Sequence, residues 1–152
     1  MAIRPTTVHA SAVLVGARAA LIRGPSGSGK SRLALELIAA ARTRLLPFAR
    51  LVADDRIHLE NAGGRLLARP PEALAGLIEV RGAGLLRLPY EASAVVGFVV
   101  DLAAADATRL PDAAARKAEI EGVWLPRLAV ASGAAALPGV LALINSAEDQ
   151  WA

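Results

Sequence analysis

The sequence feature that most constrains this chain is the run GPSGSGKS at residues 24–31. It matches the pattern G-x-x-x-x-G-K-[ST], in which glycines let successive backbone N–H groups point at phosphate oxygens. An apolar run precedes it and apolar residues at helical spacing follow it, so it lies between a strand and a helix N-terminus. We therefore predict a phosphate-binding loop made of the following residues: Gly24, Pro25, Ser26, Gly27, Ser28, Gly29, Lys30 and Ser31.

Two side chains of this loop have specific expected roles. In loops of this pattern the lysine reaches the β- and γ-phosphates, and the serine or threonine hydroxyl ligates Mg²⁺. Lys30 is therefore a predicted phosphate-binding residue and Ser31 a predicted metal ligand. The chain contains no N-K-x-D segment of the kind that reads guanine, so GTPases are disfavoured.

An acidic pair, Asp54 and Asp55, follows the apolar run at residues 51–53. P-loop enzymes hold Mg²⁺ through a strand-end aspartate, and phosphoryl transfer to a hydroxyl also needs a base that accepts its proton. Adjacent residues project differently, so the pair is suited to divide these tasks; an acidic turn after a strand is the alternative interpretation. Taken alone, Glu79 is more typical of a surface Glu–Arg pair, and His9 of a structural or surface histidine.

The order of the segments predicts the fold class. A strand, a phosphate-binding loop, a helix and further strands that end in acids, such as Asp101 after residues 95–100, are typical of an α/β P-loop nucleotide-binding fold. The turn signal NAGG at residues 61–64 predicts a hairpin, and therefore a mixed sheet. A length of 152 residues is that of one domain, so we expect a single P-loop domain over residues 1–152.

Periodicity and turn residues predict the individual elements. Strands are expected at residues 13–15, 19–22, 51–53, 56–60, 65–68, 76–84, 95–100 and 123–130, helices at 30–42, 111–121 and 140–147, and a loop at 43–50. The stretch at residues 128–147 carries no charge over 20 residues, about the length of a membrane helix. Because Pro138 and Gly139 lie inside it, we interpret it as a loop before a final helix, and expect no membrane span and a cytoplasmic protein.

Composition excludes several classes of function. The chain has no cysteine, which removes disulfide scaffolds, thiolate zinc sites and cysteine nucleophiles. Its 17 basic residues are spread singly against 14 acidic ones, so the net charge of +3 predicts no nucleic-acid partner. Hydrophobic residues make up 55% of the chain but aromatic residues only 3%, which predicts a core of aliphatic side chains.

Four motifs together resemble one known family. VHA at residues 8–10, GPSGSGKS at 24–31, LVADDR at 51–56 and IEVRGAG at 78–84 occur in this order. They resemble the catalytic domain of HPr kinase/phosphorylase, which phosphorylates a serine of the phosphocarrier protein HPr. The likeness covers about residues 6–101. We expect the short, single-domain form of this family, without the large N-terminal domain of its long members.

The resemblance implies a P-loop fold related to that of phosphoenolpyruvate carboxykinase. It implies ATP and Mg²⁺ as cofactors, an HPr-like phosphocarrier as partner, and a role in regulating carbon metabolism. It leaves open a homo-oligomer and the extent of the reverse reaction, phosphorolysis of phosphoserine-HPr. A small-molecule kinase and a nucleotide-binding sensor domain with weakened catalysis are the alternatives.

The resemblance also implies roles for individual residues. Asp55 would be the catalytic base for the acceptor serine and an acid in the reverse reaction, beside the phosphate-binding Lys30. Asp54 would support the phosphate and metal site, and Glu79 would be the second metal ligand after Ser31. His9 would be the active-site histidine.

The chain departs from the family pattern in three places. Arg32 stands where the family usually has an acid, and residues 43–50 look like an insertion. No Lys or Arg follows Arg127, although the family carries a late basic residue near its active site. We rank Arg127, Arg81 and an arginine of a neighbouring subunit as replacements for that charge, and expect a slow kinase with weaker phosphorolysis.

Overall fold

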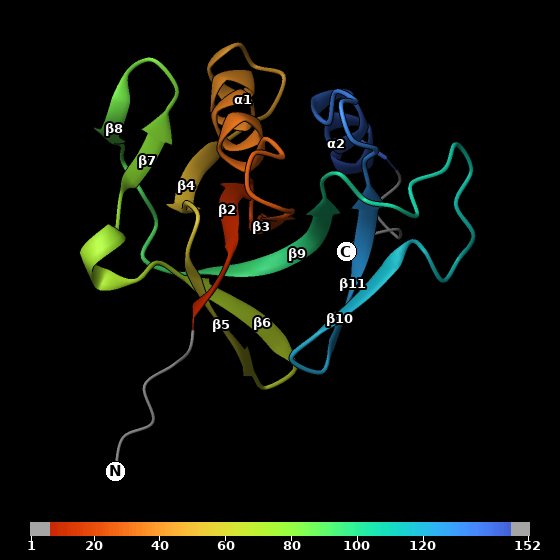
Figure 1. Cartoon of the computed structure of the whole chain (residues 1–152). Coiled ribbons are helices and arrows are strands. Elements are labelled where there is room, and N and C mark those ends of the chain that lie inside the picture. The colour runs from red at the N-terminus through yellow and green to blue at the C-terminus, as the bar shows by residue number, and fades with distance from the viewer. Residues whose placement is uncertain (1–6, 147–152) are drawn as a thin grey trace.

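The computed structural model describes residues 7–146, which form a curled, mixed sheet of nine strands with two α-helices on one face and a separate two-stranded sheet (Figure 1). The elements are β1 (Thr7–Val8), β2 (Ala10–Val15), β3 (Arg18–Arg23), α1 (Lys30–Arg42), β4 (Ala49–Ala53), β5 (Ile57–Ala62), β6 (Arg65–Arg69), the 3₁₀ turn η1 (Glu72–Leu74), β7 (Leu77–Val80), β8 (Gly84–Arg87), β9 (Ala94–Asp101), β10 (Lys117–Ile120), β11 (Val123–Ala129) and α2 (Leu137–Ile144). Among the described residues, no helix is long and apolar enough to cross a membrane.

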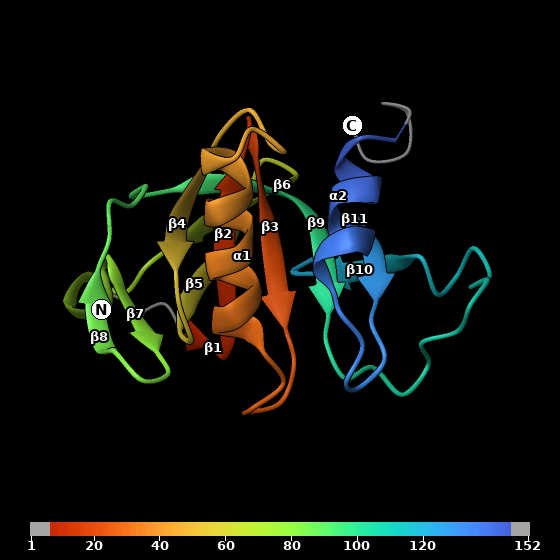
Figure 2. The ribbon, with the colours of Figure 1, turned by 90° about the horizontal axis from the view of Figure 1, so that it is seen from above.

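The direction of the strands places the candidate site. Along the sheet path β1-β5-β6-β9-β3-β2-β4, β3 is parallel to β9, and β2 is antiparallel to both β3 and β4. β11 pairs with β9 in parallel. The carboxyl ends of β3, β4, β9 and β11 therefore share one edge of the sheet (Figure 2). Ligands of open α/β sheets bind outside that edge.

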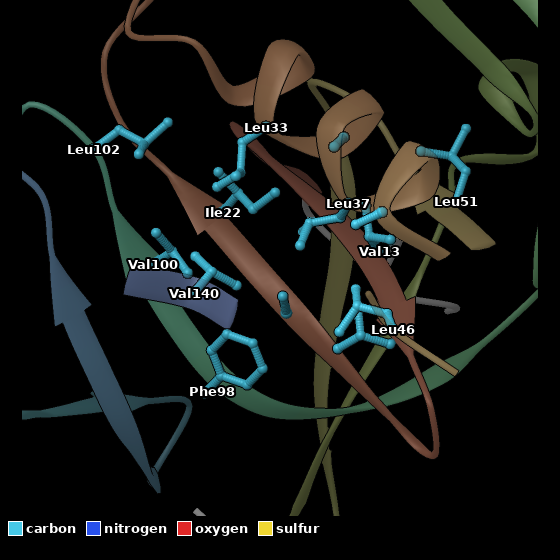
Figure 3. Close-up of a cluster of buried hydrophobic side chains, with 14 of the residues drawn as sticks. Val13, Ile22, Leu33, Leu37, Leu46, Leu51, Phe98, Val100, Leu102 and Val140 are labelled. Atoms are coloured by element: carbon cyan, nitrogen blue, oxygen red, sulfur yellow. The ribbon is translucent and has the colours of Figure 1, made fainter. Parts of the chain in front are cut away.

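Two apolar clusters, one on each face of the sheet, form the core. On one face Leu33 and Leu37 of α1 pack with Ile22 and Phe98 of the sheet (Figure 3). On the other face Leu21 packs with residues of β5, β6, β10 and β11, because the sheet curls back over itself (Figure 1). Consecutive residues of β3 thus enter opposite clusters, as the two-residue period of a strand requires.

The structure corrects one predicted helix. The helix expected at residues 111–121 is wrong, because Lys117–Ile120 forms strand β10 and pairs antiparallel with β11. Glu121 and Gly122 join the two strands with φ values of 51° and 77°, the left-handed geometry of a tight hairpin turn. Pairing with the adjacent strand β11 in a hairpin has overridden a local helical pattern.

Three boundaries also differ from expectation. Residues 76–84, expected as one strand, form β7, a turn and the start of β8. The pair Pro138 and Gly139, expected in a loop, lies in the first turn of α2, where a proline loses no helical hydrogen bond. The final helix therefore begins earlier than expected, at Leu137; the expected end at Ala147 lies outside the described residues. The predicted loop at 43–50 ends where β4 begins, at Ala49. The hairpin around residues 61–64 is confirmed as β5 and β6.

Candidate active site

The phosphate-binding loop connects β3 directly to α1. Gly27 and Gly29 have φ values of 82° and 102°, a left-handed conformation that side-chain-bearing residues rarely adopt. Lys30, the first residue of α1, is only 6% exposed, and its Nζ donates to the carbonyl oxygens of Gly24 at 2.9 Å and Pro25 at 3.2 Å. The loop thus curls around the ammonium group, which holds a cation at the helix N-terminus.

Two observations suit this loop to a phosphate group. The hydroxyl of Ser28 is buried and has no hydrogen-bond partner among the described residues, so it is available to an added oxygen. Gly24 leaves no room for a side chain, because a Cβ there would lie 3.1 Å from the Leu102 carbonyl oxygen and 2.5 Å from Ser28 Oγ. The sequence pattern and the backbone therefore agree on what the loop can bind.

Asp54 joins the loop to the sheet. Its side chain is buried, and it accepts hydrogen bonds from the Ser31 hydroxyl at 2.7 and 2.9 Å and from the Ser11 hydroxyl at 2.8 Å. The backbone N–H of Glu79 approaches the same carboxylate at 3.4 Å. Three elements, β2, β4 and α1, together with the β7 backbone, thus converge on one carboxylate.

Ser11 is a site residue that sequence reasoning missed. It is fully buried in β2, where it donates to Asp54 and accepts a hydrogen bond at 3.1 Å from the backbone N–H of Asp55. A serine between the apolar residues Ala10 and Ala12 was the available signal, since a buried hydroxyl needs a partner. Its position orients both acids of the pair.

Asp55 differs from its neighbour in conformation and exposure. Its φ of 69° is left-handed, which costs a residue other than glycine about 1–2 kcal/mol. The turn separates the two carboxylates, so that Asp54 is buried while the Asp55 side chain is 61% exposed. Asp55 is hydrogen-bonded to Nε2 of His9, which brings together two residues 46 positions apart. The division of tasks expected from the sequence is therefore geometrically available.

Glu79 lies at the margin of this arrangement. Its backbone contacts Asp54, whereas its side chain is exposed on β7. Among residues 7–146, no three His, Asp or Glu side chains form a cluster that could hold a metal ion. The Ser31 and Asp54 oxygens nevertheless fit Mg²⁺, which typically takes one or two carboxylates and fills its remaining positions with phosphate oxygens and water.

A second charged group lies at the ends of β9 and β11. Asp101 accepts two hydrogen bonds from Arg23 at 2.7 and 2.8 Å and one from Arg127 Nε at 2.5 Å. Arg127 also donates to both carboxylate oxygens of Asp106, at 2.8 and 2.9 Å, and to the Ala115 carbonyl oxygen at 2.9 Å. We call Arg23, Asp101, Asp106 and Arg127 the arginine–aspartate cluster.

Contacts within the arginine–aspartate cluster lower the pKa of both of its aspartates. Burial raises the pKa of Asp101, but hydrogen bonds and charges from Arg23 and Arg127 outweigh it and hold that pKa below its usual 3.8. The hydrogen bond from Arg127 lowers the pKa of Asp106 in the same way. The Arg127 side chain is 13% exposed and its donors are engaged, so in this structure it is not free to reach a phosphate, whereas Arg81 is exposed.

The fold and the loop define a P-loop protein of mixed α/β class, and comparisons with known proteins place it further. The family model described as HPr Serine kinase C-terminal domain matches residues 2–128, so the chain belongs to this family. The HPr kinase/phosphorylase of Clostridium beijerinckii is 39% identical over 93 residues, which is 60% of this chain and 28% of that protein. The protein of the same name from Enterococcus faecalis is 40% identical over 97 residues, 62% of this chain and 29% of that protein. The chain thus spans less than a third of these relatives.

A solved structure agrees with the fold. The Hpr(Ser) kinase/phosphatase from Coxiella burnetii superimposes with a TM-score of 0.69 over 91% of each chain, at 23% sequence identity. The resemblance read from the four motifs is confirmed by the family match, and the expected α/β fold with a mixed sheet is confirmed by this likeness.

Proposed function

We propose that this chain is the catalytic domain of an ATP- and Mg²⁺-dependent protein kinase that phosphorylates a serine of an HPr-like phosphocarrier. The observation that carries the proposal is the contact of Ser31, the last residue of the phosphate-binding loop, with Asp54, beside an exposed Asp55 paired with His9. Family membership and the HPr kinase/phosphorylase names of its relatives support the choice of acceptor. Residues 1–152 act in this proposal as one kinase domain, in the cytoplasm and in the control of carbon metabolism.

Each residue of the site has a task in this reaction. The loop amides and Lys30 bind the phosphates, and Asp54 orients Ser31. Glu79, whose backbone contacts Asp54, supplies a further metal ligand in this proposal. When bound, Mg²⁺ neutralises charge on the phosphates and ATP supplies the phosphoryl group. Asp55 accepts the proton of the acceptor serine hydroxyl as the serine oxygen bonds to phosphorus and the bond to the leaving ADP breaks.

His9 positions this base. Its Nε2 is bonded to the Asp55 carboxylate, which fixes the direction in which the remaining lone pairs of that carboxylate point. In the reverse reaction the protonated Asp55 returns its proton to the serine oxygen as free phosphate takes the phosphoryl group. Free phosphate must then be held in the site, and the arginine–aspartate cluster does not offer Arg127 for that purpose. We therefore expect a kinase with weaker phosphorolysis.

The test is incubation of the protein with ATP labelled at the γ-phosphate and with purified HPr. Label on an HPr serine supports the proposal. Label only on a small molecule would indicate a metabolite kinase, and nucleotide binding without any transfer would indicate a sensor domain. HPr with its acceptor serine replaced by alanine is the matched control, since it keeps the partner surface and removes the hydroxyl.

A further inference from the structure

The hairpin of β7 and β8 presents two different faces. Its register pairs Ile78 with Leu86 and Glu79 with Leu85. Ile78 is fully buried in the cluster under α1, so its face anchors the hairpin to the core. Because side chains alternate along a strand, Glu79 and Leu85 lie together on the opposite face. Figures 1 and 2 show this hairpin at the outer edge of the molecule, beyond β4.

Leu85 is an apolar residue at the rim of the candidate active site. It is 70% exposed. Directly opposed residues of an antiparallel pair have Cβ atoms about 4.5–5.5 Å apart, which places Leu85 beside Glu79. The Glu79 backbone in turn contacts Asp54. A single exposed leucine is ordinary, but this one is fixed by its register beside Glu79, at the margin of the candidate active site, where an acceptor would approach.

Charge and further apolar groups extend this surface. Leu74 and Tyr90, next to the hairpin, are 39% and 41% exposed, whereas Leu86, opposite Ile78, lies on the other face of the hairpin. Arg81, in the turn, and Arg87, at the end of β8, are exposed and make no ion pair with any described residue. An apolar centre with cations beside it that have no carboxylate partner among the described residues fits a protein surface that carries an apolar patch edged by acids.

We propose that the β7–β8 hairpin, with Leu85 at its centre, is the docking surface for the protein that carries the acceptor serine. This inference rests on the proposed function. A protein hydroxyl reaches Asp55 only when the surface around that hydroxyl meets the surface around the acidic pair. Leu85 lies beside Glu79, whose backbone contacts Asp54, the neighbour of Asp55. The partner surface next to the acceptor serine is accordingly apolar, and acidic side chains at its edge face Arg81 and Arg87.

The experiment compares Leu85→Ser with Leu110→Ser. Leu110 is 84% exposed on the loop between β9 and β10, on the opposite side of the molecule from the hairpin (Figure 1), so it is a matched control for losing an exposed leucine. We expect Leu85→Ser to raise the KM for HPr about ten-fold, with the KM for ATP and kcat unchanged. Leu85→Met should restore the wild-type KM, and Leu110→Ser should not change it.

Two results would overturn the docking surface. One is an equal KM for HPr in wild type, Leu85→Ser and Leu110→Ser. The other is a change of oligomeric state in Leu85→Ser, measured by sedimentation, without a change in HPr binding, which would assign the leucine to contacts between copies of the chain.

Calorimetric binding of HPr separates this inference from the proposed function. If wild type binds HPr and Leu85→Ser does not, while neither transfers phosphate, the docking surface stands and the kinase assignment fails. If wild type transfers phosphate to HPr and Leu85→Ser binds HPr equally well, the kinase assignment stands and the docking surface fails. If wild type neither binds nor phosphorylates HPr, both fail.

Discussion

Two groups of charged side chains lie at the same edge of the sheet, and the fold uses them in opposite ways. Next to the phosphate-binding loop, the buried Asp54 is held by the hydroxyls of Ser31 and Ser11, and Asp55 remains 61% exposed. In the arginine–aspartate cluster, by contrast, Asp101 is 14% exposed and both of its oxygens accept from guanidinium groups.

The carboxylates next to the phosphate-binding loop remain available to a ligand, whereas those of the arginine–aspartate cluster are engaged in structural ion pairs. Asp54 accepts from neutral hydroxyls, and Asp55 is paired with His9 and 61% exposed, so no guanidinium group among the described residues offsets the negative charge of either carboxylate. In the cluster, guanidinium partners neutralise the carboxylates and tie β3, β9, β11 and the loop of residues 102–116 together. An aspartate at the end of a strand is therefore a catalytic candidate only after its partners are known.

The strongest test of this contrast is Asp55→Asn. The amide keeps the shape of the side chain but cannot accept the serine proton, so phosphoryl transfer to HPr should fall by roughly 10²–10⁴-fold. Nucleotide binding, measured by calorimetry, should be retained. Asp112→Asn, an exposed aspartate that accepts a hydrogen bond from the Ala115 backbone, is the control and should keep its activity. Full activity in Asp55→Asn together with none in Asp54→Asn would reverse the two roles.

Arg127→Ala should affect stability more than chemistry. Removal of the guanidinium leaves Asp101 largely buried with one partner fewer and releases Asp106, so we expect unfolding to become easier by about 3 kcal/mol. Urea denaturation measures this loss. The exposed neighbour Arg116→Ala is the matched control and should change stability little. If Arg127→Ala kept full stability and lost transfer, Arg127 would belong to the catalytic group.

Lys30→Ala should produce a smaller, purely binding effect. The loss of charge-assisted hydrogen bonds to the phosphates should weaken ATP·Mg²⁺ by about 1.5–3 kcal/mol. Lys117, the other lysine of the chain, is exposed on β10, and Lys117→Ala should bind ATP as wild type does. Calorimetric titration decides, and equal affinity of Lys30→Ala and wild type would remove the phosphate-binding role of the loop.

The phosphate-binding loop and the elements that flank it could be predicted from the sequence. The loop at residues 24–31, the strand before it, the helix at Lys30–Arg42 and the acids after residue 53 all follow from local sequence. Local sequence is sufficient there because glycine positions and helical spacing act over a few residues. The contact between Ser31 and Asp54 follows from the fold only, as does that between His9 and Asp55.

The parts that sequence reasoning missed depend on partners that lie outside the segment itself. Strand β10 exists because β11 lies beside it, and the segment alone resembles a helix. Ser11 becomes a site residue only when β2 pairs with β4 and brings its hydroxyl to Asp54. The sequence predicts Arg127 as the first candidate to replace the family's late basic residue. Only the structure shows that its guanidinium is already paired with Asp101 and Asp106.

The smallest expected effect is a pH dependence of stability that arises in the arginine–aspartate cluster. The pKa of Asp101 is lowered because Arg23 and Arg127 outweigh the effect of burial, and the pKa of Asp106 is lowered by its hydrogen bond to Arg127. Both carboxyls thus bind protons more weakly in the folded chain than in the unfolded one. Their contribution to stability is present above the ordinary aspartate pKa of 3.8 and is lost as the pH falls through the lowered folded values.

In urea denaturation between about pH 5 and pH 2, wild type should lose stability more steeply than Asp101→Asn, which has no carboxylate left to protonate at that position. Equal slopes for the two proteins would mean that the cluster holds the loop by packing and not by charge.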